Sequence, residues 1–179
     1  MLLVSEVYTT PPAEFKTELQ EMTYKVLKEL DIPFERVDTE EAITMEDCLN
    51  INRALNVKVV KTLFLCNRQQ TAFYLFITEG DKPFVTKDFS KALGISRVSF
   101  APAELLYEML GTKVGATTVF SMLLDRENKV QVVIDKDVLK EEWYGCTDGT
   151  TTCYMRVKTE RILNDFLPYT KHEPKFIEV

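Results

Sequence analysis

A lysine stands at the start of an apolar segment of this 179-residue chain, where a charged side chain is unexpected. Lys61 opens the run KTLFL, and residues 59–77 read as two hydrophobic runs joined by a polar turn. Burying an ammonium group costs free energy unless a partner or a ligand compensates. Lys61 is therefore a candidate functional residue. The alternative is that it only marks the solvated entrance of a strand.

Two segments rich in glycine and threonine are the other candidates for chemistry. Residues 111–118 read GTKVGATT, and residues 145–152 read GCTDGTTT. Glycine lets a backbone approach a ligand closely, and hydroxyl side chains supply hydrogen-bond donors and acceptors. Each segment alone is also typical of a tight loop that leads into a strand, but their combination with Lys61 favours a binding site.

The common catalytic and metal-binding motifs are absent from the sequence. It contains no GxSxG, HExxH, P-loop or Rossmann motif, and its single histidine, His172, lies near the C-terminus. The four cysteines have no CxxC spacing, so the sequence predicts no metal site and no cofactor. Cys146 follows a glycine and is a candidate nucleophile, but no histidine close in sequence could activate it.

The composition narrows the classes of partner. A formal net charge of −6 argues against a broad DNA- or RNA-binding surface, which needs clustered lysine and arginine, but allows contact with the tip of a nucleic acid. The first residues have no basic segment typical of a secretory signal, and no apolar run is long enough to span a membrane. We therefore expect a cytoplasmic protein with free thiols and no membrane partner.

Hydrophobic periodicity predicts helices and strands that alternate along the chain. Helices or helical turns are expected at 13–31, 45–55 with Thr44 as N-cap, 86–94, 102–111, 137–142 and 158–169. Strands are expected at 33–39, 59–65, 73–77 (with 66–72 as the hairpin turn), 97–101, within 115–124, at 129–135 and at 150–157. This order predicts an α/β fold: one domain over residues 1–179, with an N-terminal helical segment (about 13–31) and a core (about 32–170) built on a mixed β-sheet flanked by helices.

In their order and spacing, these segments resemble the YbaK/ProX family of editing domains associated with prolyl-tRNA synthetase. The resemblance rests on KTLFL from Lys61, on residues 93–125, on the KVQVVID strand and on the second glycine-threonine turn, and it covers roughly residues 15–170. Within the family, the chain looks most like the free-standing PrdX branch.

The resemblance implies a deacylase that acts in trans on the ester of a mischarged tRNA, with alanine on proline tRNA as the expected substrate. It implies the 3′ end of aminoacyl-tRNA as a partner, and prolyl-tRNA synthetase as a candidate second partner. Lys61 would contact the terminal adenosine or the ester, and the loop around Gly115 would hold the aminoacyl carbonyl with its amides. The expected catalytic residues are Lys61, Gly115 and Asp148, and the expected substrate-binding residues are Thr62, Thr117, Thr118, Thr147 and Thr151.

The chain also departs from the family pattern at several of these positions. Thr62 and Thr151 stand where the family has asparagine, Thr147 replaces a histidine, and Asp148 and Val119 replace prolines. These departures leave a second hypothesis open, in which the domain is catalytically inactive and binds an amino acid, an aminoacyl-tRNA end or a synthetase. A thiol enzyme built on Cys146 is the third.

Overall fold

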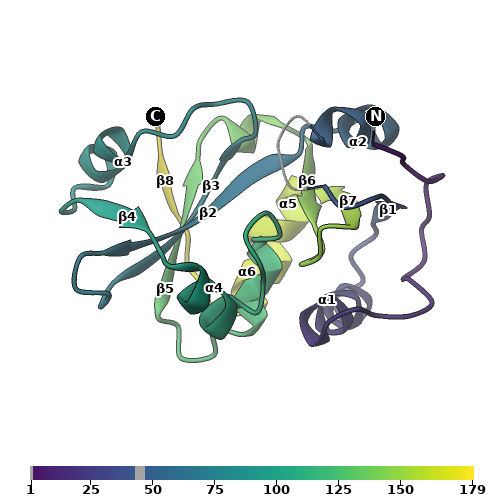
Figure 1. Cartoon of the computed structure of the whole chain (residues 1–179), viewed down its shortest axis with the longest axis horizontal. Coiled ribbons are helices and arrows are strands. Elements are labelled where there is room, and N and C mark those ends of the chain that lie inside the picture. The colour runs from purple at the N-terminus through teal and green to yellow at the C-terminus, as the bar shows by residue number, and fades with distance from the viewer. Residues whose placement is uncertain (1, 43–46) are drawn as a thin grey trace.

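A computed structural model describes residues 2–42 and 47–179, which form two β-sheets with helices packed around them (Figure 1). The larger sheet has five strands in the order β4-β2-β3-β5-β8. Strand β2 pairs antiparallel with β3 and β4, whereas β3–β5 and β5–β8 are parallel pairs, so the predicted mixed sheet is confirmed. The strands are β2 (Val60–Asn67), β3 (Phe73–Glu79), β4 (Val98–Phe100), β5 (Val130–Asp135) and β8 (Lys175–Ile177).

The smaller sheet is antiparallel, with the order β1-β7-β6. Its strands are β1 (Glu35–Asp38), β6 (Trp143–Thr147) and β7 (Cys153–Lys158). A parallel bridge between Val59 and Gly145 joins it to the larger sheet, just before β2 begins. The strands therefore divide between two sheets that meet at this bridge, a division that periodicity along the chain does not encode.

The predicted helices are present. They are α1 (Glu18–Glu29), α2 (Cys48–Leu55), α3 (Thr86–Leu93), α4 (Ala103–Leu110) and a last helical stretch made of α5 (Thr159–Arg161), the π-helical η3 (Ile162–Phe166) and α6 (Leu167–Tyr169). Gly94 and Gly111 end α3 and α4 in the left-handed conformation, as glycine allows. The predicted cap Thr44 lies outside the described residues. Within residues 2–42 and 47–179, no helix is long and apolar enough to cross a membrane.

One predicted strand is wrong, and two strands escaped prediction. The apolar run after Thr118 forms a 3₁₀ helix, η1 (Val119–Leu123), and a second 3₁₀ turn, η2 (Val138–Lys140), follows β5. Periodicity cannot distinguish a strand from a buried helical turn in so short an apolar run, and the Thr118 side chain caps the turn by accepting a hydrogen bond from Phe120 N at 3.3 Å. Strands β6 and β8 were missed because β6 contains a glycine and β8 has only three residues.

The two faces of β2 are buried in different parts of the core. Val60 and Phe64 pack with the main hydrophobic cluster, which includes residues of α1, η1 and the last helix. Leu63 and Leu65 belong to a separate cluster under α3. Because side chains alternate along a strand, Lys61 shares its face with Leu63 and Leu65, and Thr62 shares its face with Val60 and Phe64. The side chains of Lys61 and Thr62 therefore point to opposite faces of β2.

Replacing Gly145 with alanine is expected to destabilise the junction of the two sheets. A Cβ atom at this position would lie 2.7 Å from Val57 Cγ1 and 3.2 Å from the Lys58 carbonyl oxygen. Overpacking of this kind costs about 1–3 kcal/mol, which urea denaturation would measure. Adding Val57→Ala should restore part of the loss, since it removes the closest contact. Equal stability of Gly145→Ala and the unmodified protein would show that the junction tolerates a side chain.

Candidate functional site

A cavity of about 360 Å³ lies where the two sheets meet. Its walls come from β2, from β6 and from the loop between α4 and η1, and its volume falls within the range of small-molecule sites. Five of the eight predicted site residues line it: Lys61, Thr62, Gly115, Thr117 and Thr147. The structure thus gathers residues that are as much as 86 positions apart in the sequence.

The loop before η1 lines this cavity with Val114, Gly115 and Thr117. Gly115 has a φ of 91°, which a residue with a side chain rarely adopts. The loop is anchored at one end, because the buried Thr118 hydroxyl donates to the Thr147 carbonyl oxygen at 2.9 Å. Neither the Gly115 amide nor the Thr117 amide donates a hydrogen bond to any residue that the structure describes. These two amides therefore keep a free donor within the described part of the chain.

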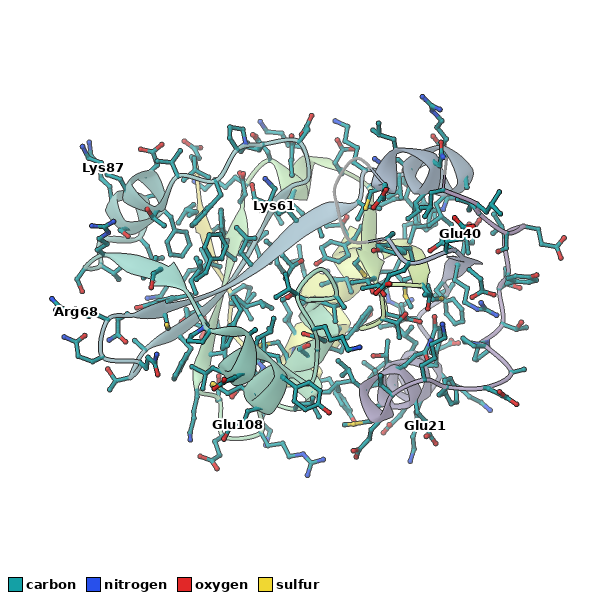
Figure 2. All side chains as sticks on the ribbon, in the orientation of Figure 1. Glu21, Glu40, Lys61, Arg68, Lys87 and Glu108 are labelled. Carbon is teal, nitrogen blue, oxygen red and sulfur yellow. The ribbon has the colours of Figure 1, made fainter. Side chains whose placement is uncertain are left out.

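Lys61 lines the cavity, and its amine is held by a neighbouring loop. The amine donates a hydrogen bond to the Lys82 carbonyl oxygen, and Figure 2 shows the Lys61 side chain at the upper edge of β2. Burial lowers the pKa of Lys61, and the nearby Asp81 carboxylate opposes this effect in part. Lys82 is itself tied down, since its amine contacts Asp135 at 2.7 Å and Asp137 at 2.8 Å. The Lys82 carbonyl oxygen takes one of the three N–H donors of the Lys61 ammonium group and fixes the direction of the side chain.

Thr62 lies on the interior face of β2, close to a buried tyrosine. Burial raises the pKa of the Tyr144 hydroxyl, Cys146 adds to this effect, and the Thr62 hydroxyl opposes it. The Tyr144 hydroxyl makes no hydrogen bond of good geometry within the described part of the chain. Thr62 therefore places a hydroxyl of β2 on the cavity side, and the Tyr144 hydroxyl lies behind it.

Asp148 lies behind the cavity wall, in a fully buried hydrogen-bond network. One carboxylate oxygen accepts from Gln20 Nε2 at 2.9 Å and from the Tyr24 hydroxyl at 2.8 Å, and the other accepts from the Thr150 hydroxyl at 2.7 Å. Burial, followed by the Asp148 charge, raises the pKa of Tyr24, so its hydroxyl stays a donor. The network joins α1 to the β6–β7 turn directly after Thr147. Asp148 thus does not line the cavity, contrary to what a direct catalytic role requires.

Two further predicted residues also lie outside the cavity. Thr118 is fully buried and holds the loop to Thr147. The Thr151 hydroxyl donates to Glu41 Oε1 at 3.3 Å on the outer side of the β6–β7 turn. Thr147 itself remains at the wall, where its hydroxyl donates to the Thr150 carbonyl oxygen and accepts from the Gly149 amide at 3.2 Å.

The cavity thiols are poorly suited to nucleophilic chemistry. Cys146 and Cys48 both line the cavity. Burial raises the pKa of the Cys48 thiol to about 11, with Asp47 adding to the effect. Burial also raises the pKa of Cys146, and the Asp148 charge raises it further. Both therefore stay protonated near neutral pH, which argues against a thiol enzyme built on Cys146.

The single histidine has a structural role away from the cavity. His172 Nε2 lies 2.8 Å from an Asp125 carboxylate oxygen, and both side chains are buried. Asp125 also accepts from the backbone amides of Lys129 and Val130 at 3.0 and 2.9 Å. Burial alone would raise the pKa of Asp125, but these hydrogen bonds, that from His172 first, hold it below its usual value. The pair fastens the C-terminal segment to the turn before β5.

Among the described residues that line the cavity, Lys61 is the only charged one. No cluster of three or more His, Cys, Asp or Glu side chains that could hold a metal occurs within residues 2–42 and 47–179. The arrangement can therefore bind a small, partly apolar group and offer it backbone amides and threonine hydroxyls, with one amine nearby.

Sequence reasoning missed several cavity residues. They are Cys48, Phe100, Val114 and Tyr154, along with apolar residues of the floor such as Leu106. Phe100 and Val114 stand at the mouth, where their side chains are 58 % and 66 % exposed. An aromatic residue at the end of a short strand and just before a helix has no sequence pattern that marks it as a cavity residue. These positions could therefore be identified only from the fold.

The chain is similar in sequence to known proteins. Residues 39–164 match the model of the family described as "Aminoacyl-tRNA editing domain". The chain is 27% identical to the prolyl-tRNA synthetase associated domain-containing protein 1 of Danio rerio, over 91% of this chain and 86% of that protein. It is 28% identical to the prolyl-tRNA editing protein ProX of Acetoanaerobium sticklandii, over 63% of this chain and 69% of that protein.

The fold is shared with solved structures of low sequence identity. One is a protein proposed to be a trans-editing enzyme for prolyl-tRNA synthetase, which superposes with a TM-score of 0.64 at 14% identity and covers 92% of this chain and 99% of that chain. A hypothetical protein gives a TM-score of 0.66 at 16% identity, over 86% of this chain and 96% of that chain. The family match spans most of the chain and includes β2, the Gly115 loop and the β6–β7 turn, so this chain belongs to the aminoacyl-tRNA editing domain family.

Proposed function

We propose that this protein is a trans-acting deacylase that hydrolyses the ester of a mischarged tRNA, with alanine on proline tRNA as its substrate. The observation that carries the proposal is the pair of unengaged amides, Gly115 and Thr117, at a cavity of about 360 Å³. Preorganised amides of this kind stabilise the oxyanion of ester hydrolysis. The names of the two relatives support proline tRNA, and a cavity of this size suits a small amino acid.

In the proposed reaction, a water molecule attacks the ester carbonyl carbon. The carbonyl oxygen becomes an oxyanion that accepts hydrogen bonds from the two loop amides. The bond between the carbonyl carbon and the ribose oxygen then breaks, and a proton from the attacking water reaches that oxygen, with the neighbouring ribose hydroxyl as relay. An aminoacyl ester is already activated, so orientation of the water and stabilisation of the oxyanion supply most of the catalysis.

The site residues divide into those that contact the substrate and those that position them. We assign Thr62, Thr117 and Thr147 to the aminoacyl group, whose ammonium their oxygens can accept, and Lys61 to the terminal adenosine or the ester. Asp148 and Thr118 act as positioning residues, since they hold the Thr147 turn and the Gly115 loop from behind. Thr151 lies outside the contact surface. The whole chain would work as one editing domain in the cytoplasm, with prolyl-tRNA synthetase as a second partner.

Deacylation of a panel of mischarged tRNAs tests the proposal, and Lys61→Ala is the informative variant. Loss of the amine is expected to lower kcat/KM on the preferred tRNA by about 10- to 100-fold, because an electrostatic contact to the ester or adenosine is lost. Lys58→Ala is the matched control. It removes a nearby lysine that is exposed and paired with Glu141 at 3.1 Å, and we expect unchanged turnover.

Two results would count against the proposal. Full activity of Lys61→Ala would remove Lys61 from the mechanism and leave the amine as a tether for the Lys82 loop. Absence of turnover on every tRNA would favour the binding module, a candidate supported by the lack of a carboxylate or imidazole among the described lining residues. Titration with stable aminoacyl-adenosine analogues would then detect binding without hydrolysis.

A further inference from the structure

Lys61 belongs to a row of polar side chains that crosses three neighbouring strands of the larger sheet, β2, β3 and β5 (Figure 1). Lys61 is the direct antiparallel partner of Thr78 on β3, so both side chains leave the sheet on the same face. The Thr78 hydroxyl donates to Asp135 Oδ2 on β5 at 2.7 Å. Thr78 and Asp135 are both buried, beside the apolar cluster that includes Phe76 and Val133. A buried carboxylate in such surroundings requires a cation.

Lys82 supplies that cation from the loop between β3 and α3. Its amine lies 2.7 Å from Asp135 Oδ2 and 2.8 Å from Asp137 Oδ2, and it donates to the Val179 carbonyl oxygen at 3.0 Å. Three acceptors match the three N–H donors of an ammonium group. Burial alone would lower the pKa of Lys82, but the hydrogen bonds to the two carboxylates raise it, so the amine stays charged. The ion pair therefore fastens the loop to β5.

The same residue holds Lys61 through its backbone. The Lys82 carbonyl oxygen accepts a hydrogen bond from the Lys61 amine, and the Lys82 amide donates to the Glu79 carbonyl oxygen at 3.2 Å, which closes the turn after β3. Pro83 follows, and a residue before proline is confined to extended conformations. The direction of the Lys82 carbonyl is therefore restricted by the turn and by the proline, and its place is set by the anchored Lys82 side chain.

We propose that Lys82 and Asp135 are positioning residues for Lys61. Their buried ion pair holds the Lys82 carbonyl in place, and this carbonyl orders the Lys61 side chain before a ligand arrives. Lys61 makes no second hydrogen bond or ion pair with any residue that the structure describes, so two of its N–H donors remain for the ligand. A lysine that is already ordered loses little further rotamer entropy when it binds. The inference rests on the proposed function for the reaction that Lys61 serves.

A double-mutant cycle tests this role, since neither Lys82 nor Asp135 lines the cavity. The variant Lys82→Met/Asp135→Asn removes the cation and the buried anion together, so the core keeps no uncompensated charge. We expect kcat/KM on the preferred mischarged tRNA to fall by at least about 5-fold in the otherwise unmodified protein, and by less than about 2-fold in the Lys61→Ala background. An equal loss in both backgrounds would show structural support alone and would overturn the proposal.

Lys140→Met is the matched control. Lys140 also pairs with Asp137, at 2.8 Å, but its side chain is exposed and it has no contact with Lys61 or with the Lys82 carbonyl. We expect unchanged kcat/KM for this variant. Lys82→Arg keeps a cation beside both carboxylates and should retain most of the activity that Lys82→Met/Asp135→Asn loses. A loss in Lys140→Met as large as that in the double variant would contradict the proposal, because it would need no link to Lys61.

A second measurement requires no catalysis. NMR relaxation of the Lys61 side chain, whose signals are assigned by their absence from Lys61→Ala, reports its order in the free protein. The order parameter should fall in Lys82→Met/Asp135→Asn and stay unchanged in Lys140→Met. An unchanged order parameter in the double variant overturns the proposal. A lower one, combined with no hydrolysis of any ester by the unmodified protein, would uphold the positioning of Lys61 and contradict the deacylase activity.

Discussion

Alanine in place of Gly115 is expected to lower kcat for ester hydrolysis by about 10²- to 10³-fold, the cost of losing one oxyanion donor. Gly115 has a φ of 91°, and a side chain there strains the backbone by about 1–2 kcal/mol, which the exposed loop can relieve by moving. Such a movement displaces the Gly115 and Thr117 amides from the reacting carbonyl. Single-turnover kinetics on mischarged tRNA would measure the effect on the chemical step.

Gly94→Ala is a matched control for this variant. Gly94 also has a positive φ, 71°, and a Cβ atom there would meet no other atom within 4 Å. The Gly94→Ala substitution therefore imposes similar backbone strain at the end of α3, outside the cavity lining. The two variants should lose similar stability, and only Gly115→Ala should lose activity. Full turnover by Gly115→Ala would mean that the loop amides do not bind the oxyanion.

Asp148→Ala is expected to lower the free energy of unfolding by roughly 3 to 5 kcal/mol, the largest loss among these variants. The carboxylate accepts hydrogen bonds from Gln20, Tyr24 and Thr150, and its removal leaves those buried donors without a partner. The turn after Thr147 then loses its attachment to α1. Urea denaturation would measure the stability, and kinetics on the folded fraction should show a raised KM, because Thr147 lines the cavity.

Milder variants separate this positioning role from direct catalysis. Tyr24→Phe removes one donor and keeps the carboxylate, so it should cost about 1 kcal/mol and change KM little. Asp148→Asn keeps the shape of the side chain but replaces one acceptor by a donor. Its loss of unfolding free energy should lie between those of Tyr24→Phe and Asp148→Ala. If the folded fraction of Asp148→Asn lost kcat by orders of magnitude with KM unchanged, Asp148 would be acting on the reaction itself.

Much of the fold could be predicted from the sequence because its signals are local. The hairpin of β2 and β3 has two apolar runs and a polar turn, and α4 lies between a proline and a glycine. The run at Val119–Leu123 failed because its burial on all sides removes the periodicity that distinguishes strand from helix. The division into two sheets depends on where β6 meets the residue before β2, which is a long-range property.

The candidate site, too, could be predicted only where its signals are local in sequence. Lys61 was identified because a lysine is unusual in an apolar run, whereas Thr62 and Gly115 were identified through the family resemblance, and all three line the cavity. The β6–β7 turn was identified as a whole, but which of its side chains faces the cavity depends on the turn geometry. Thr147 points to the wall, whereas Asp148 is drawn inward by Tyr24 and Gln20 on α1, which is more than 100 residues away in sequence.

The position of the cavity at the junction of the sheets couples ligand binding to the cohesion of the molecule. Val59 and Gly145 form an isolated bridge between the two sheets, and the cavity is lined from both sides of it. A ligand that touches β2 and β6 at once adds contacts across this junction, beside the main hydrophobic cluster that the two sheets share. It binds only where both sheets are in place, so occupancy favours their assembled state in proportion to RT ln(1 + [L]/Kd). The substrate therefore helps to hold together the two halves of the site that recognises it.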